Sequence, residues 1–101
     1  MSKRRRRGIR GFNITSLPYE VKVYMNNQVL IPAQLVRSLG IQGAERARVT
    51  LEFKGKRATV EVKLLRTKYT DSRQFTIPKE VRLRLGLKPG DIIKVLKIER
   101  I

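Results

Sequence analysis

The sequence contains no cysteine, no histidine and no tryptophan. Without cysteine the chain cannot form disulfides, and nothing in it indicates an oxidising compartment. The missing Cys and His side chains also exclude the usual zinc sites, and they leave neither a thiol nor an imidazole to act as nucleophile or general base. We therefore expect no metal ion and no cofactor.

Long hydrophobic runs are missing as well. No apolar stretch approaches the roughly 18 residues that a membrane-spanning helix needs. The N-terminus is basic, but it lacks the apolar segment that follows the charged end of a secretory signal. These absences predict a cytoplasmic protein that does not associate with membranes.

Acidic residues are scarce, with eight Asp and Glu against 24 Lys and Arg, so the net charge is +16. A surface this basic repels itself unless anions compensate it, and nucleic acid is the usual polyanion. The few acids are scattered along the chain, and the glycines fit turns and helix ends better than a phosphate-binding loop. An enzyme is therefore not expected.

Residues 1–11, MSKRRRRGIRG, form a compositional segment of their own. Its cations are Lys3, Arg4, Arg5, Arg6, Arg7 and Arg10. Subtracting these six charges from +16 leaves +10 for the rest of the chain. The segment is too polar to join a core, so we expect a flexible arm that binds a polyanion. A membrane surface is the weaker alternative, because neither a lipidation signal nor an amphipathic helix accompanies the arm.

The remaining residues contain an internal repeat. An offset of 46 positions places Ile31-Pro32 on Ile77-Pro78 and Leu39-Gly40 on Leu85-Gly86. Apolar positions and turn residues keep their places between the two copies. We interpret this as a duplicated unit of about 45 residues, a period typical of repeated supersecondary structure.

Each unit predicts short strands around one short helix. In the first unit, alternation and turn residues predict strands at Tyr19–Met25, Val29–Ile31, Arg46–Phe53 and Ala58–Leu65, and a helix from Pro32 to Gly40. In the second, they predict strands at Lys68–Asp71, Gln74–Ile77 and Ile92–Ile98, and a helix at Pro78–Leu85. The last strand of the first unit has no counterpart, and Phe12 to Leu17 are candidates for its place. One unit is too small to bury its apolar face, so we expect a shared core.

The residues YTDSRQFTIPKEVRLRLGLKPGDIIKVLKI, from Tyr69 to Ile98, resemble the AbrB/SpoVT family of swapped-hairpin domains. Tyr24 to Leu64 match more loosely, because Gln42-Gly43-Ala44-Glu45 replaces the proline-glycine turn. The resemblance implies a mainly β protein with two short helices, an AbrB-like swapped-hairpin β-barrel built from two ββαββ-type repeats. We expect the repeats at residues 12–66 and 67–101, within a monomeric pseudo-dimer or a homodimer.

The resemblance also implies binding of nucleic acid, most often DNA, through basic residues around the first hairpin and the helix of each unit. On this sequence these are Arg73, Lys79, Arg82 and Arg84. The first unit has Asn27, Ala33, Val36 and Ser38 at the same places. An asymmetric surface favours one asymmetric partner over a palindromic site.

Two other groups of side chains are candidates for contacts with nucleic acid. Lys54, Lys56 and Arg57 lie at a predicted hairpin tip, where they either contact phosphates or are simply the polar residues of a turn. The aromatic residues Phe12, Tyr19, Tyr24 and Tyr69 can stack on bases, but for most of them we expect core packing.

These observations predict a non-catalytic nucleic-acid-binding protein. The arginine arm and the unequal halves favour structured RNA such as ribosomal RNA, bound by an accessory ribosomal protein of archaeal type or another ribonucleoprotein component, with ribosomal proteins as neighbours. The alternative is an AbrB-like DNA-binding transcription regulator or chromatin protein on duplex DNA. The expected location is accordingly the ribosome or the nucleoid. An adaptor for a protein partner is disfavoured, because the chain lacks an acidic or apolar extension.

Overall fold

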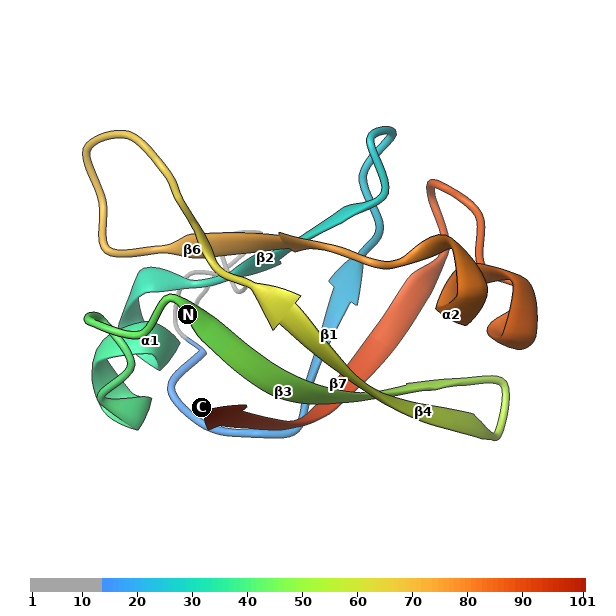
Figure 1. Ribbon diagram of the computed structural model, residues 1–101, viewed down its shortest axis with the longest axis horizontal. Helices are drawn as coiled ribbons and strands as arrows, with labels where there is room; N and C mark the ends of the chain where they lie inside the picture. The colour runs from blue at the N-terminus through green and yellow to red at the C-terminus, as the bar shows by residue number, and fades with distance from the viewer. Residues whose placement is uncertain (1–13) are drawn as a thin grey trace, which may run out of the picture.

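The structure, a computed structural model, describes residues 14–101 as a mainly β fold with two short helices and two antiparallel sheets (Figure 1). The predictions for the basic arm, residues 1–11, and for Phe12 lie outside the described residues. The larger sheet has the order β1 (Tyr19–Lys22), β7 (Ile92–Arg100), β3 (Arg46–Phe53) and β4 (Lys56–Lys63). The smaller sheet has the order β2 (Gln28–Ile31), β6 (Arg73–Thr76) and β5 (Leu65–Arg66).

The strand pairs connect the two halves of the sequence. Strands β1 and β3 both pair with β7, and β2 pairs with β6. Val29 lies directly opposite Phe75, which is the residue 46 positions later and its counterpart in the repeat. A pairing of equivalent residues arises where two like units meet around a pseudo-twofold axis.

The helices begin and end within one residue of the predicted positions. Helix α1 (Ala33–Leu39) follows Pro32, and α2 (Lys79–Leu85) follows Pro78, each proline having φ −59°. The helices end at Gly40 and Gly86, whose φ angles of 68° and 73° lie in the left-handed region. Glycine adopts this region without the penalty that a Cβ atom imposes, so Leu-Gly is an effective helix stop.

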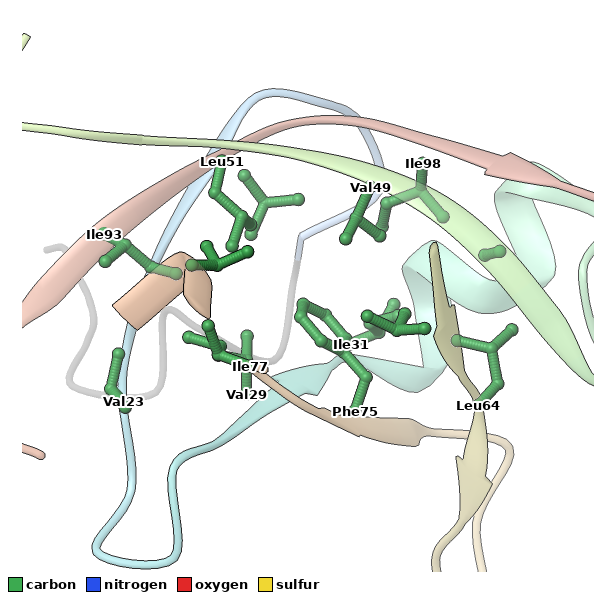
Figure 2. Close-up of a cluster of buried hydrophobic side chains, with 14 of the residues drawn as sticks. Val23, Val29, Ile31, Val49, Leu51, Leu64, Phe75, Ile77, Ile93 and Ile98 are labelled. Atoms are coloured by element: carbon green, nitrogen blue, oxygen red, sulfur yellow. The ribbon is translucent and has the colours of Figure 1, made fainter. Parts of the chain in front are cut away.

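The core lies between the two sheets and is closed by the helices (Figure 2). Val29, Ile31 and Phe75 from the smaller sheet face Val49 and Leu51 from the larger one. All five side chains are fully buried. Because strands of both halves contribute to this one cluster, each half buries part of its apolar face against the other half.

Three predicted strands differ most from the structure in position. Lys68–Asp71 is a loop, and the short strand before it is β5. Strand β4 begins and ends two residues earlier than Ala58–Leu65, because the turn is shorter than predicted. Strand β1 ends at Lys22, where the chain bends towards the next turn.

Residues 14–17 do not provide an additional strand. The two sides of β7 are occupied by β1 and β3. Strand β4 pairs with the outer side of β3, and β1 pairs with the outer side of β7 in the same way. Residues 14–17 therefore cannot pair with β7, because both of its sides are already paired.

Candidate nucleic-acid interface

Two groups of predicted cations come together at one end of the molecule. Helix α2 packs against β4, and in Figure 1 the helix and the β3–β4 turn lie at the right-hand end. We call this region the cationic end, and it comprises Lys54, Lys56, Arg57, Lys79, Arg82 and Arg84. The two groups are more than 20 residues apart in sequence, so tertiary packing brings them together.

The β3–β4 turn presents its three cations to solvent. Lys54 and Gly55 have φ angles of 51° and 82°, which is the signature of a tight two-residue hairpin turn. Lys54, Lys56 and Arg57 are all exposed. The Lys54 ammonium lies 5.2 Å from the centroid of the Phe53 ring, and Arg57 Nε lies 4.0 Å from Glu52 Oε1. Of these three cations, only Arg57 forms an ion pair with an acidic side chain among residues 14–101, and its 4.0 Å is at the outer limit of an ion pair.

Helix α2 buries one face and presents its cations on the other. Val81 and Leu85 are buried, whereas Lys79 and Arg84 are exposed. Arg82 is half-buried, and its Nε donates a hydrogen bond of 3.1 Å to the Ile77 carbonyl. Within residues 14–101, no acidic side chain forms an ion pair with any of the three.

The opposite end, around α1, has a different chemistry. Ala33, Val36 and Ser38 occupy the places of Lys79, Arg82 and Arg84, and Val36 is fully buried. The cation of this helix, Arg37, forms an ion pair of 3.0 Å with Asp71. The backbone repeats between the two ends, but the positive surface of α2 is not repeated on α1.

The prediction that Arg73 lies on a binding surface is wrong. Its side chain is 1% exposed. The guanidinium donates hydrogen bonds to the carbonyl oxygens of Asp71 at 2.6 Å, Ser72 at 3.0 Å and Gln42 at 2.7 Å. The arginine therefore connects the segment after α1 to the segment before β6, and these donors are not free to contact phosphate.

The tyrosines divide between core and surface. Tyr19 is buried, as expected, and its hydroxyl donates a 2.7 Å hydrogen bond to the Leu30 carbonyl. Burial raises the pKa of Tyr19 well above its ordinary value. Tyr24 is 44% exposed and Tyr69 is 98% exposed, so core packing is wrong for Tyr69. In the sequence, Tyr69 lies between Lys68 and a run of small polar residues, which is typical of a loop. The aromatic ring of Tyr69 favours a strand and so conceals this signal.

The described part of the chain holds no group of three or more acidic side chains that could bind a metal ion. Neither of its helices is long and apolar enough to cross a membrane.

No protein-family model matches the sequence, and no curated protein matches it. Among solved structures, the fold is similar to the solution structure of PHS018 from Pyrococcus horikoshii, with a TM-score of 0.63 and 21% sequence identity. The match covers 83% of this chain and 92% of that one. The comparison shows that the two chains share their overall fold.

Proposed function

We propose that the protein binds structured RNA through the cationic end and the arginine-rich N-terminal segment, as an accessory ribosomal or other ribonucleoprotein component. The main support for the proposal is that packing of α2 against β4 places six of the predicted binding residues, all of them cationic, at one end of the molecule. Among the described residues, Arg57 is the one member of this group that forms an ion pair with an acidic side chain. Polyphosphate is the ligand that this arrangement of charge fits best.

The mechanism is largely electrostatic. Lysine and arginine side chains on phosphates release the cations condensed on a nucleic acid, and this release drives binding. Lys54, Lys56, Lys79 and Arg84 are exposed, so their charges can approach a phosphate backbone without rearrangement of the fold. Few amide side chains accompany them, and we therefore expect weak readout of base sequence.

The unequal ends favour RNA over a palindromic DNA site. A twofold operator needs the same contacts from both halves of a protein. Here α1 has Ala33 and the buried Val36 where α2 has Lys79 and Arg82. The second candidate is an AbrB-like DNA-binding regulator, and the pairing of Val29 with its counterpart Phe75 is the observation that favours it.

We also propose that the fold is the swapped-hairpin barrel of the AbrB/SpoVT family, formed by the two repeats of one chain. Pairing of β1 with β7 and of β2 with β6 across the halves supports this interpretation. So do the matching proline and glycine residues at the ends of the two helices.

A salt titration tests the electrostatic mechanism. We expect the double variant Lys79→Ala/Arg84→Ala to bind a fluorescent RNA stem-loop more weakly and to lower the slope of log affinity against log salt by about two. Both side chains are exposed, so the melting temperature should stay within a few degrees of the wild type.

The matched control is Lys63→Ala/Lys97→Ala, which removes two exposed lysines outside the cationic end. We expect the slope to change by less than half a unit. An equal change in both double variants would show that net charge acts without a defined interface, and a flat salt response of the wild type would refute the mechanism.

Fractionation of cell extracts decides between RNA and DNA. We expect the protein to sediment with ribosomes and to be released by RNase treatment but not by DNase. Release by DNase alone would replace the RNA proposal with the DNA-binding alternative.

A further inference from the structure

A groove is lined in part by residues of α1. Helix α1 lies at the end of the molecule opposite the cationic end (Figure 1). The volume of the groove is about 650 Å³, and its lining includes Arg37, Arg66, Tyr69, Ala33, Thr67 and Thr70. A smaller apolar cleft of about 270 Å³ shares Ala33, Arg37 and Thr70 with it and reaches Leu30 and Pro32. Small-molecule sites commonly have volumes of about 300–1,000 Å³, so the groove has room for a nucleotide-sized group.

Tyr69 at the rim of this groove has two properties that folding does not explain. Its side chain is 98% exposed, so the ring contributes almost nothing to the core. Its φ angle of 69° lies in the left-handed region, which is unfavourable for a bulky side chain and is better suited to Gly or Asn. A strained, solvent-facing aromatic residue is better explained by a ligand than by the stability of the chain.

The loop holds Tyr69 in this conformation through a set of hydroxyl contacts. Thr67 Oγ1 and Thr70 Oγ1 are 2.9 Å apart, and the two lie 2.5 Å and 2.6 Å from Ser72 Oγ. Beneath them, the buried Arg73 donates to the carbonyls of Asp71 and Ser72. The ring is therefore presented by a preorganised loop, which lowers the entropy cost of binding.

The charge around the ring suits a phosphate. Arg66 is exposed and has no ion-pair partner within residues 14–101, and Lys68 is exposed next to Tyr69 in sequence. The charge of Arg37 is matched by Asp71, which also lines the groove. The unpaired positive charge in the lining of the groove is thus that of Arg66.

We propose that this groove binds an unpaired nucleotide of the RNA, with its base stacked on Tyr69 and its phosphate near Arg66; this inference rests on the proposed function. A base inside a duplex has both faces covered, so only a base in a loop, bulge or end can stack on the ring.

Binding to two RNA probes tests the inference. One is a blunt duplex, and the other has the same stem with an unpaired loop. Removing an aromatic stacking partner costs about 1–3 kcal/mol, so we expect Tyr69→Ala to weaken binding of the looped probe about tenfold. Binding of the blunt duplex should change less than twofold, because the cationic end is at the opposite end of the molecule.

Two further substitutions separate stacking from loop structure. Tyr69→Asn suits the left-handed backbone, so it should melt no lower than the wild type and yet bind the looped probe as weakly as Tyr69→Ala. Tyr69→Trp keeps an aromatic ring, so it should bind the looped probe about as tightly as the wild type. It also introduces the one tryptophan of the chain, whose emission should be quenched by the looped probe and not by the blunt duplex.

Tyr24→Ala, at the start of the β1–β2 turn, changes another exposed tyrosine; it is the matched control and should leave both affinities unchanged. If all Tyr69 variants bind the looped probe as tightly as the wild type, the proposal that the groove binds an unpaired nucleotide is wrong. The proposed function would not be affected by that result. Equal quenching of Tyr69→Trp by the blunt duplex would overturn the assignment to unpaired nucleotides. A wild-type protein that binds neither probe at low salt would overturn the proposed function itself.

Discussion

At the scale of single residues, burial decides what a polar side chain does. Arg73 and Arg84 have the same charge, but the donors of Arg73 are directed to backbone carbonyls in the interior while Arg84 is exposed on α2. Leaving those carbonyls without a donor costs several kcal/mol in a buried site, so Arg73 serves the fold. Tyr19 is a second polar side chain in the interior, and its effect on stability depends on pH.

The contribution of Tyr19 should decrease at alkaline pH. Burial holds its pKa in the folded state above the ordinary value of 10.0, whereas the unfolded chain ionises near that value. The stability that this difference provides is complete below pH 10 and is lost as pH rises towards the folded-state pKa. We expect a loss of about 1.4 kcal/mol per pH unit above the ordinary value.

Urea denaturation of the wild type and of Tyr19→Phe at pH 8 and pH 11 measures this effect. At pH 8 the variant should be less stable by about 1 kcal/mol, because it lacks the hydrogen bond to the Leu30 carbonyl. At pH 11 the two should be nearly equal, or their order reversed. A difference that is constant with pH would contradict the role of burial.

At the scale of elements, local conformational rules determine the helix ends and the β3–β4 turn. Proline before each helix and glycine after it make the ends of α1 and α2 alike. The β3–β4 turn deviates from the rule, because Lys54 occupies a left-handed position that Asn adopts at lower cost. A residue that disagrees with its local backbone is a candidate for a functional role.

Lys54→Asn should separate stability from binding. Asn relieves the backbone strain, while the contact of Lys54 with the Phe53 ring is lost, so we expect the free energy of unfolding to change by no more than about 0.5 kcal/mol. The salt slope of RNA binding should decrease by about one.

Lys63→Asn, at the other end of β4, removes the same charge away from the cationic end. Its salt slope should match that of the wild type. If Lys54→Asn leaves the slope unchanged as well, the tip of the hairpin does not contact phosphate.

At the scale of the whole molecule, neither half contains a complete core. The buried cluster joins residues of both halves, and β7 lies between two strands of the first half. Residues 67–101 are fewer than the roughly 40 below which a chain usually needs additional support to fold. We therefore expect folding and the formation of the interface between the halves to occur together.

Two fragments, residues 1–66 and 67–101, test this dependence. We expect neither fragment alone to show a cooperative thermal transition by circular dichroism. An equimolar mixture should regain β structure and a cooperative transition whose midpoint rises with concentration. A fragment that melts cooperatively alone would show that the halves are independent domains.

The sequence was most informative where conformation is local. The positions of Pro32, Gly40, Pro78 and Gly86 predict both helices within about one residue, because a missing N–H and a left-handed backbone are properties of single residues. Strand β3 is predicted at its observed bounds, because its alternation is regular over eight residues. The strand predicted at Lys68–Asp71 is wrong, since hydroxyl contacts among Thr67, Thr70 and Ser72 favour a loop that no periodicity reveals.

The sequence by itself thus determined the basic charge, the repeat and the helix ends, which depend on composition and on short-range backbone preferences. Only the tertiary structure decided which cations lie close together. It buried Arg73, brought β4 against α2, and exposed Tyr69 at a groove. The physical reason is that burial and proximity result from contacts between residues far apart in the chain, and the charge or ring of a side chain alone does not specify its neighbours.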